Sequence, residues 1–539
     1  MSAETTSNVV ERMKGRGAGA DRPRVVFRTD WKRATRRLIV GGLCAVTAAS
    51  LTFPSVAMAA EWVNVGGHHY DAAAGDETWS WDGANDMQLN DYNGGPIEAA
   101  GHLDLTYEGD NTVTNDNTVT NDSGEGISVI DGDNEKAELN ITGGASDSLT
   151  VDATSDAIKS EGDINISGDG TITSTASSGD GIDAEGNLTI SGSGTVNATG
   201  SSDGIEVGGN ELGGNVTISG GGSVTASSDR SSGMQVYGAL SVTDSTLVAT
   251  GAREGLYAYK GVTFDHATVR VAARNPGNEA FGLFTDEDDI VIRNGSVVEA
   301  FAEGAYSAGI STQNYEKGVA GGHMFVSESV VKAVARYLEG EEQDGGDIAM
   351  NYASADVDGD EQLGRNVGIL VVTKNGMSPA KLSIVRSTVT AEGDTAAILV
   401  CATSEDGSVA GTIELEGSIV QTPASGHVSD YNAKHEGRND VEYDVGQTIG
   451  LSGETITSLD SADIAKSAVI VPEEVPVPAP SGSSTSGGAN VTQATARKTS
   501  VAGSAIPQTG DASLAGVLSA GFAGLAALVS GLFVSRKRG

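Results

Sequence analysis

The chain has 539 residues, of which 33 are basic and 73 acidic, so its formal net charge is −40. A protein with this charge repels nucleic acid and anionic lipid, which excludes both as partners of its surface. Cysteine occurs only twice, so disulfides do not form the framework, and the fold must be stabilised by burying apolar side chains over a long, glycine-rich, repetitive body.

The N-terminal segment 1–59 has the pattern of a signal peptide. A polar, basic stretch with a twin-arginine pair precedes an apolar run at 38–53, which is too short and too rich in small residues for a typical membrane span. Ala57 and Ala59 then form a small-x-small cleavage site. We predict export with cleavage after Ala59, by either the general secretory or the twin-arginine route.

Aromatic and histidine side chains are concentrated at 60–95. Trp62, Trp79 and Trp81 lie there with several tyrosines and two adjacent histidines. The end of a repetitive β-fold exposes its core and its strand edges, so we predict that this segment is a folded N-terminal cap. The alternative is that the three tryptophans bind a ligand by stacking on sugar rings.

A short repeat runs through 96–428 and predicts the fold. Each unit has three segments in which apolar and polar residues alternate, separated by Gly, Asn, Asp and Ser, and these are strand and turn signals. One unit cannot bury its apolar face alone, so successive units must stack. The apolar residue of the first segment recurs at Ile97, Ile127, Ile158, Ile182, Ile205, Met234, Leu256, Leu283, Ile310, Ile369 and Ile398.

These units predict an all-β protein whose body is a right-handed parallel β-helix of about eleven coils. An array of β-sandwiches is the competing interpretation, and three strands within so short a unit argue against it. The repeat is interrupted by an acidic insertion at 336–366. A C-terminal cap at 429–471 is expected to close the other end.

Two sets of acidic residues are candidate calcium ligands. Asp156, Asp180 and Asp203 occupy one position in three successive units, where they either cap turn amides or share Ca²⁺ along a ladder. The second set lies in the insertion, whose glycine is misplaced for an EF-hand loop, so an ordinary acidic loop is its alternative. This second set consists of Asp356, Asp358 and Asp360.

The C-terminal segment 506–539 has the order of a cell-wall sorting signal. A Pro-, Ser- and Gly-rich linker at 472–505 precedes a pentapeptide, an apolar segment at 514–534 that is long enough to cross a bilayer as a helix, and a basic tail. This arrangement resembles the LPXTG signal of Gram-positive surface proteins, with Ile in place of Leu. The pentapeptide consists of Ile506, Pro507, Gln508, Thr509 and Gly510.

That resemblance implies two partners, a sortase and peptidoglycan. The sortase would cleave between Thr509 and Gly510 and join the Thr509 carbonyl to a cell-wall amine. We therefore expect a secreted protein that is anchored to the wall of a Gram-positive bacterium. It would meet the membrane only through 514–534, before sorting.

The repeat at 126–275, with its Asp-Gly-Ile and Ile-Ser-Gly elements, resembles bacterial extracellular β-helix proteins described as carbohydrate-binding. The resemblance implies glycan ligands without supplying contact residues. Most acidic residues lie in turn positions and no Ser-His-Asp or HExxH pattern is present, so we predict a non-enzymatic adhesin or glycan-binding rod, with calcium as the one cofactor considered. A purely structural wall-layer or stalk protein is the first alternative, and a β-helix polysaccharide lyase or hydrolase is the second.

Overall fold

The structure is a computed structural model that describes residues 60–116, 123–133, 136–209, 213–314, 322–339, 366–374, 379–404, 407–436 and 441–473. Every helix or strand in these residues is a β-strand, so the predicted all-β class is confirmed. No helix in this part of the chain is long and apolar enough to span a membrane. The compact unit that contains these residues ends at Glu473.

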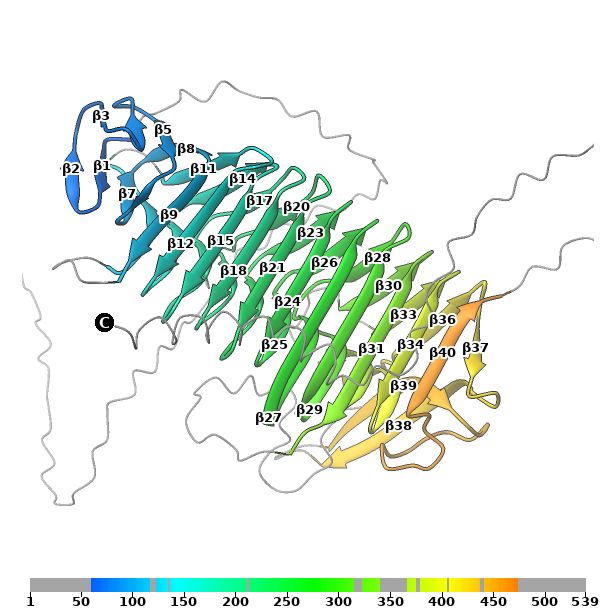
Figure 1. The fold of residues 1–539 in the computed structure, drawn as a ribbon. Helices are drawn as coiled ribbons and strands as arrows, with labels where there is room; N and C mark the ends of the chain where they lie inside the picture. Colours follow the sequence, from blue (N-terminus) through cyan, green and yellow to red (C-terminus); the bar gives the residue numbers. More distant parts are fainter. Residues whose placement is uncertain are drawn as a thin grey trace, which may run out of the picture. The chain divides into compact units, whose positions relative to one another are not determined.

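Three rows of parallel strands build this unit, and each repeat contributes one strand to each row (Figure 1). The first row contains β7 (Ile97–Ala100), β10 (Ile127–Ile130), β13 (Ile158–Ser160), β16 (Ile182–Ala184), β19 (Ile205–Val207), β22 (Met234–Val236), β25 (Glu254–Ala258), β32 (Val367–Lys374) and β35 (Ala396–Ser404). These strands begin on, or contain, the recurring apolar residue that the sequence marks as the first segment of each unit.

The second row is the parallel part of a 14-stranded sheet. It contains β5 (Asp86–Asn90), β8 (His102–Glu108), β11 (Glu138–Gly143), β14 (Asp163–Gly168), β17 (Leu188–Ile190), β20 (Val216–Ile218), β23 (Ala239–Thr243), β26 (Gly261–Asp265), β28 (Ile290–Arg293), β30 (His323–Ser327), β33 (Lys381–Val385) and β36 (Thr412–Glu416).

The third row joins the first into a 26-stranded sheet. It contains β6 (Asn93–Gly94), β9 (Asp110–Asn115), β12 (Ser148–Ala153), β15 (Thr171–Ala176), β18 (Thr195–Gly200), β21 (Ser223–Ser228), β24 (Thr246–Gly251), β31 (Val330–Tyr337) and β34 (Thr388–Gly393). The two rows are connected because β27 (Thr268–Thr285) and β29 (Val297–Asn314) are long enough to pair with the third row at their beginning and with the first row at their end.

Stacking in register is what makes each strand stable. Ile166, Ile190 and Ile218 are directly opposite one another on β14, β17 and β20, and all three are buried. The intervening residues, such as Thr189, point outward because side chains alternate along a strand. Burying each inward Ile, Leu or Val contributes roughly 1.5–3 kcal/mol. Large parallel sheets with this repeated register are compatible with a β-helix-like fold.

One strand of the second row lies where the repeat is irregular in the sequence. β30 lies between β28 and β33 and buries Met324 and Val326. It falls in the long interval between Ile310 and Ile369, before the insertion at 336–366 that interrupts the repeat. Ile310, on β29, and Ile369, on β32, are nevertheless direct partners in the first row.

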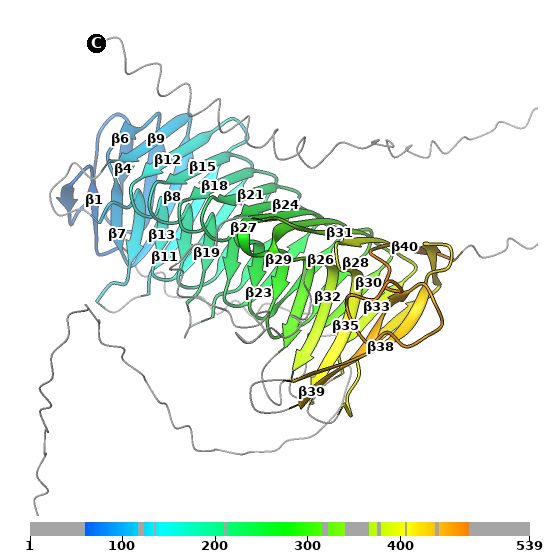
Figure 2. The same cartoon turned by 90° about the horizontal axis from the view of Figure 1, so that it is seen from below.

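Antiparallel strands close the sheets at both ends. At the N-terminal end, β1 (Trp62–Val65) pairs with β7 and with β2 (His68–Tyr70), while β4 (Trp79–Trp81) pairs with β5 and with β3 (Ala74–Gly75). At the C-terminal end, β39 (Val441–Gly450) pairs with both β35 and β38 (His427–Glu436), and Figure 2 shows the three strands together at this end. β40 (Ser467–Pro472) pairs with β34 and with β37 (Ser418–Thr422).

Glycines at the turns between the second and third rows allow the coils to stack closely. Gly168, Gly192 and Gly220 lie at successive levels with φ angles of +92°, +101° and +93°. A Cβ atom at Gly192 would lie 2.2 Å from the carbonyl oxygen of Gly168. Both the positive φ and this backbone contact explain why the turn requires glycine.

Candidate functional site

The three stacked aspartates lie in the turns that lead into the first row, each two residues before its strand β13, β16 or β19. Oδ1 of Asp156 accepts a hydrogen bond from the backbone N–H of Asp180 at 2.9 Å, and Oδ1 of Asp180 accepts one from Asp203 N–H at 2.6 Å. The series continues with Asp203, whose Oδ1 accepts a hydrogen bond from Ser232 N–H at 2.7 Å. One oxygen of each carboxylate therefore caps a turn of the next coil, which is one of the two roles that the sequence left open.

We call the column formed by Asp156, Asp180 and Asp203 the ladder. Three further charged residues, which were not predicted as ligands, lie beside it. Each follows its aspartate by three residues, and strand pairing places Lys159, Asp183 and Glu206 directly opposite one another. Nζ of Lys159 lies 3.0 Å from Oδ2 of Asp156 and 2.7 Å from Oδ2 of Asp183. The ammonium group therefore occupies the position between these carboxylates that a cation would otherwise take.

A second cluster of carboxylates, farther along the ladder, contains more negative charge than the cluster that Lys159 contacts. Carboxylate oxygens of Asp180, Asp203 and Glu206 lie within 4.8 Å of one another, and among the described residues no salt bridge reaches any of the three. Burial raises the pKa of Asp180 and of Asp203 to about 6 and that of Glu206 to about 8. Repulsion adds to the effect, from the neighbouring aspartates at Asp180 and Glu206 and from Glu254 at Asp203. The raised pKa of Glu206 favours the protonated form of its side chain at neutral pH.

This group has part of the chemistry of a calcium site. Ca²⁺ prefers about six to eight oxygen ligands, and carboxylates are suitable donors. Three carboxylates converge here, but one oxygen of Asp180 and one of Asp203 are already used by turn amides. A divalent cation and a proton would compete for the oxygens that remain.

A pH titration of stability tests the charge state of this group. The pKa values of Asp180, Asp203 and Glu206 are higher in the folded chain than in the unfolded chain, so protonation favours the folded state. We expect the melting temperature to rise as the pH falls from about 8 to about 5. At pH 8, millimolar CaCl₂ should raise it more than NaCl of equal ionic strength does, because the cation replaces the protons.

The matched variant for this titration is Asp180→Asn with Glu206→Gln, which keeps acceptor oxygens and removes two charges. It should melt at a higher temperature than the parent chain at pH 8 and should show a smaller pH and calcium dependence. If protons and calcium acted only by relieving charge repulsion across the whole chain, whose net charge is −40, the melting temperatures of the parent chain and the variant would depend on them equally. Parallel curves for the two proteins would therefore contradict the assignment to this group.

The three tryptophans of the N-terminal cap have different environments. Trp79 and Trp81 are buried in the main core, with exposed fractions of 7% and 2%, so neither presents a ring to a ligand. Trp62 is half-buried on β1, with its ring centroid 5.4 Å from that of His69. Of the three, only Trp62 reaches the surface.

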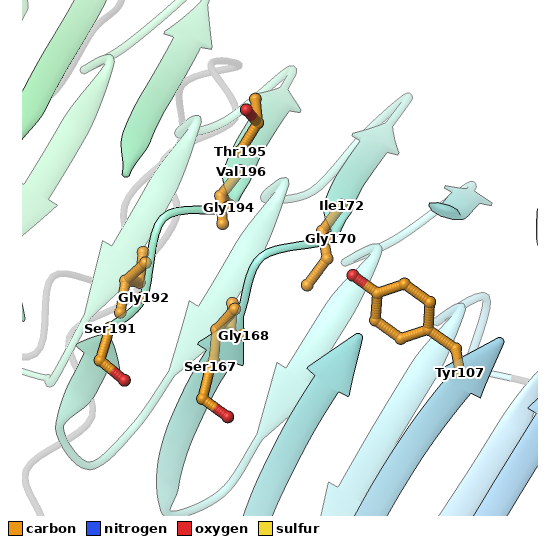
Figure 3. A pocket seen from close by; sticks show the side chains of 12 residues that line it. Tyr107, Ser167, Gly168, Gly170, Ile172, Ser191, Gly192, Gly194, Thr195 and Val196 are labelled. Carbon is orange, nitrogen blue, oxygen red and sulfur yellow. The ribbon is translucent and has the colours of Figure 1, made fainter. Parts of the chain in front are cut away.

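The cavity shown in Figure 3 lies at the glycine turns between the second and third rows. Gly168, Gly170, Gly192 and Gly194 form much of its wall, and the ring of Tyr107 lies at one side. Its volume of about 10 Å³ is enough for no more than one water molecule. It is therefore a packing gap between coils and not a ligand pocket.

Comparison with protein-family models, curated proteins and solved structures finds no match to this chain.

The remaining predicted site residues lie outside the described residues. These are Ala57 and Ala59 of the cleavage site, Asp356, Asp358 and Asp360 of the acidic insertion, and the pentapeptide Ile506 to Gly510.

Proposed function

We propose that this chain is a non-enzymatic surface protein that is secreted and anchored covalently to the wall of a Gram-positive bacterium. Its β-strand body binds glycans, so that the protein acts as an adhesin or glycan-binding rod. The order of segments carries the proposal: a signal peptide, a long repetitive β-body, a Pro-rich linker, the pentapeptide 506–510, an apolar span and a basic tail. Sortase and peptidoglycan are the partners that this order requires.

We also propose that the body is a right-handed parallel β-helix of about eleven coils. Its support is the repeated pairing of each strand with the equivalent strand of the next repeat, as in the series Ile158, Ile182 and Ile205. Such a body suits an exposed position, because its length grows with the number of repeats and each coil adds further surface.

A glycan array probed with the purified full-length chain tests the binding part of the proposal. We expect one or a few related glycans to bind, because a repetitive surface selects repeating ligands. Incubation with the bound polysaccharide should leave its chain length unchanged. Failure to bind any glycan would favour the purely structural alternative, and shortened products would show an enzyme.

A further inference from the structure

The outward side chains of five adjacent strands in the third row form a surface rich in hydroxyl groups. The strands β12, β15, β18, β21 and β24 lie next to one another in this order (Figure 1). Each presents three outward positions, and because the strands pair in register these positions form three columns. We call this surface the hydroxyl face. Twelve of its fifteen positions are Ser or Thr, and all of these are partly or fully exposed: Ser148, Thr150, Thr171, Thr173, Thr175, Thr195, Thr199, Ser223, Thr225, Ser227, Thr246 and Thr250.

The hydroxyl face is almost uncharged in a chain whose net charge is −40. The three positions without a hydroxyl are Asp152 at one corner, Asn197 and Val248. Nucleic acid and anionic lipid are recognised by Lys and Arg, and the hydroxyl face contains neither. Protein interfaces are centred on Trp, Tyr, Arg or large apolar anchors, and the face lacks these as well. The composition therefore favours an uncharged, hydroxyl-bearing partner.

Hydrogen-bonding groups on this face are available to such a partner. Some hydroxyls are engaged at the edges, where Ser148 donates to Asp110 at 2.9 Å and Thr199 pairs with Ser227 at 3.0 Å. Within the described part of the chain, the hydroxyls of Thr173 and Thr225 have no protein partner. A hydroxyl donates one hydrogen bond and accepts up to two, which matches the hydroxyl groups of a sugar.

The regular spacing between the strands of the hydroxyl face suits a polymeric partner with a repeating unit. Adjacent strands lie about 4.8 Å apart, so the five strands present the same groups at regular intervals over roughly 20 Å. Individual hydroxyl contacts are weak, and their sum becomes useful only when one ligand makes many of them at once. A polymer of neutral sugars can do this, whereas a single sugar can contact only one or two levels.

We propose that the hydroxyl face is the surface on which this protein binds an extended, uncharged polysaccharide. This inference rests on the glycan binding proposed above and specifies its location and ligand class. Acidic polysaccharides are disfavoured because the rest of the chain repels them. The half-exposed ring of Trp62 on β1 is not required for the contact.

The test compares two pairs of isosteric substitutions in the purified full-length chain. Thr173→Val with Thr225→Val removes two hydroxyls from the centre of the hydroxyl face, while Thr189→Val with Thr217→Val removes two outward hydroxyls from the second row as a matched control. Binding is measured by affinity electrophoresis in neutral polysaccharides (cellulose derivatives, xylan and mannan) and in anionic polygalacturonate. Thermal melting verifies that both variants fold.

We expect binding to a neutral polysaccharide that weakens about tenfold in the first pair and is unchanged in the second. We also expect affinity to rise with oligosaccharide length until the ligand spans the face. Equal binding by the parent chain and both variants would overturn this location while leaving glycan binding intact. Binding to polygalacturonate alone would overturn the ligand class, and no binding to any polysaccharide would overturn the inference together with the proposed function.

Discussion

Replacing Thr509 with alanine should abolish covalent attachment of the protein to the cell wall. The resemblance of 506–510 to the LPXTG signal implies that the Thr509 carbonyl is the group transferred to the wall amine, and the motif precedes an apolar span and a basic tail as sorting requires. The parent chain should co-purify with wall fragments released by muramidase. The Thr509→Ala chain should instead remain in the membrane fraction or appear in the medium.

Gln508→Ala is the matched control, because this position is variable in the motif that the sequence resembles. It should remain attached to the wall. Should the Thr509→Ala chain still migrate with muramidase-released fragments, the sorting assignment would be wrong, and the apolar segment 514–534 would be better explained as a membrane anchor. A loss of attachment in both variants would point to misfolding or poor export of the altered tail.

The second large effect is expected from Ile190→Asp in the second row. Ile190 is 6% exposed and lies between Ile166 and Ile218, so a carboxylate there would be buried with no partner. Loss of the apolar side chain and burial of the charge should together cost at least about 4 kcal/mol. Each coil is stabilised by its neighbours, so the damage should extend to adjacent coils.

The control for this substitution is Thr189→Asp, one residue earlier on β17. Thr189 faces outward between Asn165 and Thr217, where a carboxylate stays hydrated, so we expect a change within about 1 kcal/mol. Thermal melting measures the difference, and amide hydrogen exchange shows how many coils lose protection. Similar melting temperatures for the two variants would contradict the inward and outward assignment of this strand.

The strand positions could be predicted from the sequence because their signals are local. The recurring residue of the first row is visible at Ile158, Ile182 and Ile205, and structural pairing places these residues opposite one another. Alternation within each strand likewise predicted which side chains would be buried. The regular spacing on which this prediction depends is broken around β30, where long segments intervene.

The cluster of Asp180, Asp203 and Glu206 shows a second limit of prediction from the sequence. The pattern Asp-x-x-Lys, Asp-x-x-Asp and Asp-x-x-Glu is present in the chain at Asp156, Asp180 and Asp203, and with the register known it places the second charged residue beside the ladder. Only the first residue of each pattern was predicted as a calcium ligand. The second residue matters as well, because Lys159 neutralises one end of the ladder and Glu206 adds charge at the other.

By itself the sequence determined the all-β class, the repeat and the inward-facing residues, because a strand's period of two and its turn residues are properties of neighbouring positions. Only the tertiary structure decided which groups interact across coils. The raised pKa of Glu206 and the three columns of the hydroxyl face arise because strands distant in sequence stack about 4.8 Å apart, and the burial of Trp79 and Trp81 depends on how the N-terminal strands pack on the core. At that spacing, carboxylates lose water and repel one another, and exposed hydroxyls form a continuous surface, which no single repeat can produce.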